Sequence, residues 1–357
     1  MNKNISIKNI IMFTGSYCAY LMGASFSSGR EMLQYFSGYG IKGFGGMAFT
    51  CIVFIYAGYV IMKTARRERF NDPFEVYTYF CGRKLGTLFI WFLTILMVAD
   101  IIMMTSSAGA NLSENMGYSG YIGRCTCLLA ALTVCLGLNR IVDVLSKLGP
   151  AVAISMIILA VIAIVKCPVT LAEGNAIIPQ LDIYTGNGSI TESSLRYTMY
   201  CVITCFPILV VCGMKAESDK EIKAAAVSQV AAWGTVCVLA MISQIVNIES
   251  IYNYEIPNMV LVKMYLPALH GVFSIIILIC TYSATTLMLW TIVRKFAEEN
   301  TKKYYIITIA IGIAAYLLSG VLPFSRILAL VFNNGFYPGI LFMAILVIKQ
   351  IKERKAS

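Results

Sequence analysis

The chain has 357 residues, of which 59% are hydrophobic and only 13% charged. This apolar content exceeds the roughly one-half that is usual for a globular domain, which excludes an ordinary soluble protein. The net charge of +10 does not indicate a nucleic-acid partner, because the basic residues concentrate between apolar blocks. The twelve cysteines lie mostly inside those blocks and form no CxxC pair. We interpret them as small buried hydrophobes and expect neither a disulfide framework nor a zinc site.

The apolar blocks are close to the roughly 20 residues that a helix needs to cross a bilayer. In chain order, the predicted spans are 10–38, 43–63, 85–112, 121–139, 147–166, 195–214, 222–247, 259–293, 303–320 and 322–349. The first block is too long for a signal peptide and lacks a following cleavage site, so we interpret it as a membrane helix. The sequence therefore predicts an all-α polytopic protein of a lipid bilayer with about ten transmembrane helices, and leaves its oligomeric state open.

The distribution of basic residues predicts the orientation. With the N-terminus in the cytoplasm, the cytoplasmic segments hold 21 of the 28 Lys and Arg residues. The remaining seven are Lys42, Arg124, Lys166, Arg196, Lys263 and Arg326 on the outer side and Arg30 within the first span. The positive-inside rule then predicts a protein of the cytoplasmic membrane with both termini in the cytoplasm.

The ten spans divide into two units of five, residues 1–167 and 195–357, joined by an extracellular loop at 168–194. Because five is odd, the second unit must enter the membrane from the opposite side. Two such units form the layout of inverted-repeat transporters. No residue-level repeat is visible between the halves, so the symmetry is inferred from topology.

The first span of each half carries an irregularity. In the first half, small and hydroxyl residues between two glycines weaken the helix: Gly23, Ala24, Ser25, Phe26, Ser27, Ser28 and Gly29. We expect a broken helix, with a small-residue packing seam as the alternative. In the second half the irregularity is Pro207, preceded by Tyr200, Thr204, Cys205 and Phe206, and a simple kink is the alternative. The corresponding positions of the two predict one substrate site between them.

The stretch from Met22 to Glu31, followed by Leu33-Gln34-Tyr35-Phe36, resembles the opening signature of the YkvI-like membrane proteins. The stretches Ser107–Asn111, Leu136–Asn139 and Pro323–Ser325 are similar to further patterns of that family. Its grouping with the amino acid–polyamine–organocation transporters implies the leucine-transporter fold, a 5+5 inverted repeat with helices 1 and 6 broken. The resemblance also implies a small amino acid, amine or related zwitterion as substrate, coupled to Na⁺ or H⁺.

Other function classes are a non-transporting membrane sensor on a transporter fold and an ion channel. The sequence shows no repeated pore segment. An intramembrane enzyme would need HExxH, which the chain lacks, or a Gly-x-Ser-Gly serine with a partner base, and only one histidine, His270, is present. We therefore expect no enzyme activity and no cofactor other than a coupling ion.

For sodium, the resemblance implies backbone carbonyls of Ala19 and Met22 and hydroxyls of the eighth span. Ser283 is the first hydroxyl candidate. Ala284 stands where the family tends to have a second hydroxyl, so Thr285 and Thr286 form an alternative in a shifted register. Hydroxyls bonded back to their own helix are the other alternative, and the choice between Na⁺ and H⁺ stays open.

Asp100 lies near the middle of the third span, where an ionised carboxylate is costly. It is predicted to be a counter-ion for a substrate amine or a proton carrier. An internal pair with Arg30, or a position closer to water, is the alternative. Arg30 and Glu31 are predicted to form a gate or an internal charge pair.

Overall fold

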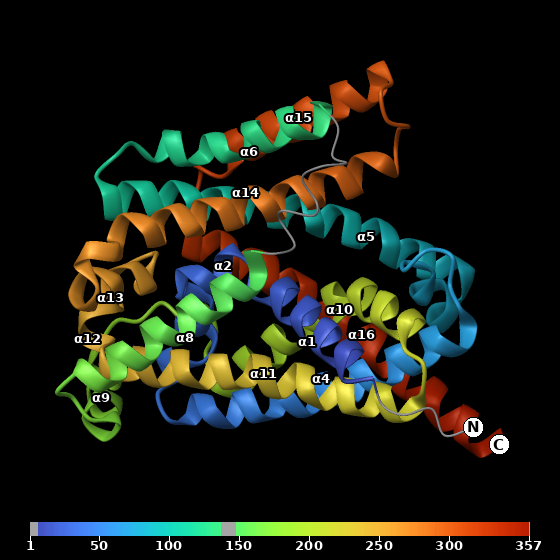
Figure 1. Ribbon diagram of the computed structural model, residues 1–357, viewed down its shortest axis with the longest axis horizontal. Coiled ribbons are helices and arrows are strands. Elements are labelled where there is room, and N and C mark those ends of the chain that lie inside the picture. The colour runs from blue at the N-terminus through green and yellow to red at the C-terminus, as the bar shows by residue number, and fades with distance from the viewer. Residues whose placement is uncertain (1–5, 137–147, 357) are drawn as a thin grey trace.

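The computed structural model describes residues 6–136 and 148–356, and within these ranges it contains helices and no strand (Figure 1). The first half consists of α1 (Ile7–Leu21), α2 (Ala24–Ser28), α3 (Arg30–Tyr35), α4 (Lys42–Glu68), α5 (Glu75–Ala110), α6 (Gly120–Leu136) and α8 (Leu148–Lys166). A short π-helical turn, η2 (Asn111–Asn115), extends the end of α5.

The short helix α9 (Leu171–Ile177) lies in the connecting loop, where Thr170 and Glu173 form a capping box. The second half consists of α10 (Ile190–Lys215), α11 (Asp219–Val246), α12 (Ile248–Ile251), α13 (Pro257–Tyr265), α14 (His270–Arg294), α15 (Lys302–Leu318) and α16 (Phe324–Ala356).

Helices occupy all ten predicted apolar blocks, although residues 137–139 and 147 of two blocks lie outside the described ranges. In the described part of the chain, six helices are long and apolar enough to cross a membrane. A seventh span is added if residues 153–166 and 171–180, which are bent by 92°, count as one. The predicted block 259–293 contains two helices, because Pro267 begins a 3-10 turn that separates α13 from α14.

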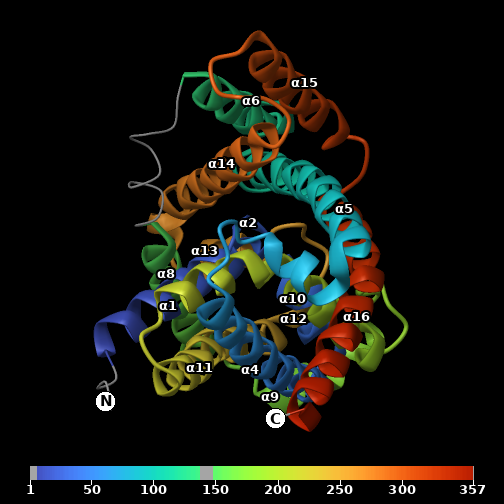
Figure 2. The ribbon, with the colours of Figure 1, turned by 90° about the vertical axis from the view of Figure 1, so that its right-hand side faces the viewer.

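The helices form two groups that each draw on both halves of the chain (Figures 1 and 2). The first two spans of each half pack together, with α4 against α10 and α11, and α1 against both. The third and fourth spans of each half, α5, α6, α14 and α15, form the second group. Helix α8 packs on α1 and α11, and α16 packs on α10 and α5. The first four spans of one half therefore each pack against the equivalent span of the other half, as in an inverted repeat, whereas α8 and α16 pack on different helices.

The first span is broken, as the sequence predicts. Helix α1 ends at Leu21, and Met22 leaves the helical region with φ −91° and ψ 51°. Helix α2 ends at Ser28, and the next residue, Gly29, adopts the left-handed conformation with φ +83°. Side-chain amides from the second half bind the exposed backbone, because Asn258 donates to the Ser27 carbonyl and Gln244 to the Gly29 carbonyl. The protein itself thus satisfies part of a non-helical backbone at membrane depth.

The predicted break in the sixth span does not occur, because α10 continues through Pro207. Proline lacks the N–H that would bind the carbonyl four residues earlier, that of Ile203. The hydroxyl of Tyr77 in α5 donates to this Ile203 carbonyl at 2.6 Å. The hydroxyl of Tyr20 in α1 donates to the next carbonyl, that of Thr204, at 2.7 Å. Tertiary hydrogen bonds therefore keep the helix continuous where the sequence indicates an interruption.

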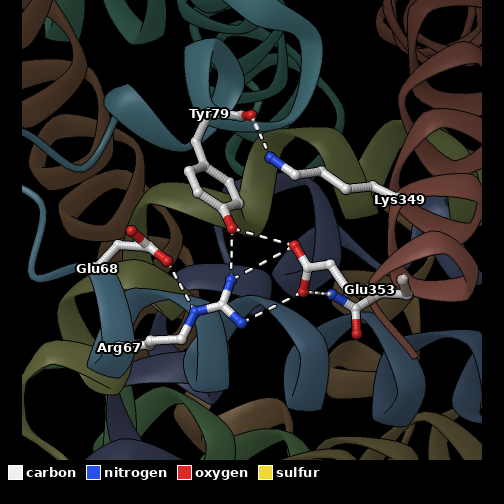
Figure 3. Close-up of polar contacts among 6 residues, drawn as sticks. Arg67, Glu68, Tyr79, Lys349 and Glu353 are labelled. Carbon is white, nitrogen blue, oxygen red and sulfur yellow. Dashed lines mark hydrogen bonds and ion pairs between the residues drawn. The ribbon is translucent and has the colours of Figure 1, made fainter. Parts of the chain in front are cut away.

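Both described ends of the chain lie at one end of the bundle, which we call the termini end (Figures 1 and 2). Basic residues at the end of α4 hold neighbouring helices there: Arg66 pairs with Asp219 at the start of α11. Arg67 binds the Tyr79 hydroxyl of α5 and the Glu353 carboxylate of α16, the latter at 3.3 Å (Figure 3). Helices α9, α12 and α13 lie at the opposite end.

Candidate functional site

A small cavity lies beside the break in the first span. Its volume is about 50 Å³. The residues that line it come from α1 to α3, α5, α10, α14 and α16: Tyr20, Leu21, Gly23, Ser25, Glu31, Asp100, Met103, Met104, Tyr200, Cys201, Thr204, Met288 and Phe332. Both halves of the chain therefore contribute to one central cavity, which contains two carboxylates.

A larger cavity of about 310 Å³ continues from it toward the termini end. The two cavities share Tyr20, Asp100, Thr204 and Met288. The larger one also includes Pro73 and Phe74 from the loop between α4 and α5, and Pro207, Val211, Leu287 and Thr291 from the later parts of α10 and α14. The larger cavity therefore lies between the central cavity and the termini end.

A basic group lies beside this larger cavity. The Lys295 ammonium, just beyond α14, donates to the Thr94 hydroxyl at 3.0 Å. It also lies 3.9 Å from the centre of the Phe74 ring, and Phe74 lines the cavity. Burial lowers the pKa of Lys295, while the nearby carboxylate of Asp72 acts in the opposite direction.

Asp100 projects from α5 into the junction of the two cavities. Its side chain is buried, with 3% of the residue exposed. Tyr200 of α10 donates to Oδ1 at 2.5 Å. The other oxygen, Oδ2, accepts no hydrogen bond, and no basic side chain pairs with Asp100 among the described residues. Asp100 does not pair with Arg30, which excludes the first alternative, whereas its place on the larger cavity leaves the second, a position closer to water, open.

Glu31 follows the break and lines the small cavity from α3. Ser25 of α2 donates to Oε2 at 2.6 Å, and Tyr197 of α10 donates to Oε1 at 2.7 Å. No basic partner for Glu31 exists in the described residues. The predicted internal charge pair between Arg30 and Glu31 is therefore absent, because the two side chains leave α3 toward different partners.

Arg30 instead points toward the end of the bundle opposite the termini. Its guanidinium donates to the backbone carbonyls of Tyr252, Tyr254 and Tyr184, at 3.2, 3.1 and 3.4 Å. These carbonyls belong to the loop after α12 and to the loop that joins the two halves. Arg30 thus ties the first span to two loops of the opposite end.

Two carboxylates join further elements at the same end of the bundle. Glu255 accepts hydrogen bonds from the backbone N–H and the hydroxyl of Ser325 at the start of α16, at 2.6 and 2.9 Å. Glu114 of η2 accepts from the backbone N–H groups of Glu255 and Ile256. The opposite end is therefore held closed by contacts between elements of both halves, while the cavity opens toward the termini end.

The structure separates the predicted substrate residues into two sets. Gly23, Ser25, Asp100, Tyr200, Thr204 and Pro207 line one or both cavities. The others do not: Phe26, Cys205 and Phe206 are buried in the core, Ser27 and Ser28 donate to backbone carbonyls within the break, and Gly29 packs against Asn258 and Gln244. The backbone of Ala24 begins α2, and its side chain lies outside what the structure describes.

Several lining residues were not predicted: Tyr20, Met103, Met104, Cys201, Met288 and Phe332. Phe332 stacks on Tyr200 with ring centres 3.9 Å apart and thereby brings α16 into the site. The sequence offered one indication of these lining residues, which is that Tyr20 lies just before the break in the first span. The other residues are apolar or small, and in an apolar span such residues look alike.

The eighth-span hydroxyls predicted to bind sodium differ in their hydrogen bonds. Ser283 and Thr286 each donate to the carbonyl four residues earlier, both at 2.7 Å. The Thr285 hydroxyl, and that of Thr281 one turn earlier, are buried without a partner in the described residues. The carbonyls of Ala19 and Met22 accept no hydrogen bond from the described residues, and α2 packs against α14. A hydroxyl that donates its proton still has lone pairs for a cation, so Thr281, Ser283, Thr285 and Thr286 all stay candidates for Na⁺.

No family model matches the chain. It is 22% identical over 343 residues to the uncharacterized membrane protein YkvI of Bacillus subtilis (strain 168), which covers 95% of this chain and 96% of that protein. Among solved structures it is similar to a manganese transporter of Eremococcus coleocola bound to an aromatic bis-isothiourea compound, with a TM-score of 0.59 and 12% identity over 98% of this chain and 80% of that one. A point mutant of the same transporter gives a TM-score of 0.58 at 13% identity.

These likenesses establish the fold. The protein has the architecture of a membrane transporter; the similar curated protein is a membrane protein and the similar solved structures are of a transporter, and none of them is an enzyme. Manganese is the substrate of the structural neighbour. In the described part of this chain, no group of three or more His, Cys, Asp or Glu side chains is arranged to hold a metal ion.

Proposed function

We propose that the protein is a secondary active transporter of the cytoplasmic membrane that moves a small amino acid, amine or related zwitterion by alternating access. The observation that carries this proposal is the position of Asp100. A buried carboxylate with one unpaired oxygen faces a central cavity that has no basic side chain among its lining residues. An ionised carboxylate at membrane depth is costly unless it is paired, and the ammonium group of a substrate supplies the missing cation.

The surroundings of Asp100 support an organic cation over a bare metal ion. The rings of Tyr20, Tyr200 and Phe332 and the thioethers of Met103 and Met288 line the same cavity. Aromatic faces attract ammonium groups, and thioethers pack against apolar substituents. The small volume of about 50 Å³ suits a small substrate and requires some opening to admit it.

Alternating access is supported by the asymmetry of the two ends. The cavity continues toward the termini end, whereas Arg30, Glu114 and Glu255 hold the opposite end closed. With the predicted orientation, this is an inward-facing conformation in which Arg30 belongs to the outer gate. A channel would need a path that passes both ends at once. For Na⁺ coupling, the candidate ligands are the hydroxyls of Thr281, Ser283, Thr285 and Thr286 and the carbonyls of Ala19 and Met22, and H⁺ is the other coupling ion.

A thermal-shift screen tests substrate binding directly. The panel holds L-alanine, glycine betaine, ethanolamine, putrescine, succinate and Mn²⁺, each with and without Na⁺. A ligand at 100 times its Kd adds about 2.7 kcal/mol to stability. Stabilisation by ammonium compounds supports the proposal. Stabilisation by Mn²⁺ alone would contradict the substrate class, and a response to the same compounds without any flux would favour a sensor.

A further inference from the structure

Glu31 and Asp100 share one small cavity but differ in how their oxygens are used. Asp100 lines both cavities and keeps Oδ2 free. Glu31 lines only the small cavity, and both of its oxygens accept hydrogen bonds, from Ser25 and from Tyr197. Each residue is 3% exposed. The cavity therefore offers one open carboxylate oxygen, on Asp100, and one enclosed carboxyl group, on Glu31.

One substrate ammonium carries one positive charge, which pairs with only one of the two carboxylates. The second carboxylate then stays in a site from which water is largely excluded. An unpaired buried charge is costly, and such a group is neutralised instead. Both oxygens of the Glu31 carboxyl already accept hydrogen bonds from hydroxyl groups. A proton is the one cation that fits there, because it takes the place of the donor hydrogen in one of these bonds.

We infer that Glu31 binds a coupling proton, while Asp100 receives the ammonium group of the substrate. This inference rests on the proposed function, since a coupling proton has a role only in a transporter. It assigns H⁺ as a coupling ion. It also gives the two carboxylates different ligands, the substrate for Asp100 and the proton for Glu31.

The contacts of Glu31 show how proton binding would be linked to conformation. Its two hydroxyl partners belong to different halves: Ser25 to α2, within the broken span, and Tyr197 to α10. An ionised Glu31 accepts a hydrogen bond from both. A protonated Glu31 donates through one oxygen, so the hydroxyl on that side must accept and turn its own proton elsewhere. Loading the proton therefore changes the link between the broken span and α10.

The other titratable groups near Glu31 do not supply a competing cation. They are Tyr35 on α3, Asp100 on α5, Tyr197, Cys201 and Cys205 on α10, and Cys237 on α11. All are neutral or acidic. The neighbouring Arg30 is directed to the carbonyls of Tyr252 and Tyr254.

Infrared difference spectroscopy tests this assignment, with the proton itself as the probe. Spectra of the purified protein are recorded at increasing pH, without substrate or Na⁺. The wild-type protein is expected to show a carboxyl C=O band that is lost as pH rises. Glu31→Gln should lose this component. Asp100→Asn should keep it, which separates the contributions of the two carboxyls that share the small cavity. Identical pH-dependent bands in wild type and Glu31→Gln would overturn the inference.

Tyr197→Phe provides a second test if Glu31→Gln does not fold. It keeps the ring and the carboxyl group but removes one donor that stabilises the ionised form. The midpoint of the Glu31 band should then move to higher pH, and an unchanged midpoint contradicts the assignment. Because the titration needs no substrate, its failure leaves the proposed transport function standing. Conversely, a positive titration with no ligand binding in the thermal-shift screen would count against the transport function alone.

Discussion

Asp100 is the residue on which substrate recognition depends in this account. Asp100→Asn keeps the shape of the side chain and the contact with Tyr200 but removes the charge. The affinity for ammonium-bearing ligands should fall at least tenfold, which corresponds to about 1.4 kcal/mol, and the affinity for anionic ligands such as succinate should fall much less. Thermal-shift titrations measure both. Asp182→Asn, at an exposed position in the connecting loop, is the matched control, and equal losses in both variants would contradict the role of Asp100.

Ser25 and Thr204 border the cavity from different helices, α2 and α10. Ser25→Leu or Thr204→Leu fills the space and is expected to abolish ligand-induced stabilisation while leaving a monodisperse protein. Ser25→Ala and Thr204→Val remove the hydroxyl without added bulk and should retain most binding, since Ser25 donates to the Glu31 carboxyl and Thr204 only to carbonyls of its own helix. Wild-type affinity in both leucine variants would mean that the two irregularities are packing features or hinges.

The predictability of the site differs from residue to residue. Ser25 and Asp100 were identifiable because a hydroxyl between glycines and a carboxylate inside an apolar span are both unusual. Met288 and Phe332 were not, because each lies among similar apolar residues and reaches the cavity only through tertiary packing. Glu31 was expected to face Arg30, its neighbour in sequence, but the geometry of α3 sends the two side chains in different directions.

The two irregular spans show what sequence indicates about an element and what it cannot. Glycines and small hydroxyl residues act through the local backbone, so the break before α2 follows from the residues themselves. The effect of Pro207 depends on whether another part of the chain can bind the carbonyl that it leaves free. Tyr77, which binds this carbonyl, is 126 positions away from Ile203 in the sequence. No local sequence pattern predicts this contact.

A double-mutant cycle tests this explanation for α10. Tyr77→Phe removes the hydroxyl that binds the Ile203 carbonyl and should destabilise the protein by about 1–3 kcal/mol, because a buried acceptor loses its partner. In a Pro207→Ala background the helix regains its own N–H donor, so the same change should cost markedly less. Thermal unfolding in detergent gives the four values. Equal costs in both backgrounds would show that the Tyr77 hydroxyl does not compensate for the proline.

At the scale of the whole molecule, spans of the two halves interleave around one cavity. The ten helical blocks were predictable, because membrane length and apolarity act on each segment separately. Their grouping into two sets is consistent with the inverted topology that an odd number of spans per half predicts. The side on which the cavity opens was not predictable, since it depends on contacts such as those of Arg30 and Arg67, which join residues from opposite halves of the sequence.

The predicted orientation can be tested on a background without native cysteines. A single cysteine at Asn71, in the exposed loop between α4 and α5, should be protected from an impermeant maleimide in intact cells and react after lysis. A single cysteine at Ser119, in the exposed loop before α6, should react from outside. This labelling pattern is expected because Lys and Arg are in excess on the segments predicted to lie on the same side as the termini. The reverse labelling pattern would invert the membrane orientation and make the observed conformation outward-facing.

Counterflow in proteoliposomes tests the central claim most directly. Liposomes containing the purified protein are loaded with the compound that stabilises it most in the thermal-shift screen and are then diluted into a trace of the same compound carrying a radiolabel. The account predicts saturable, transient accumulation of label by wild-type protein, none by Ser25→Leu, and a strong reduction by Asp100→Asn. Label entry no greater than in protein-free liposomes, for every compound that binds, would contradict a transporter and identify the protein as a membrane sensor.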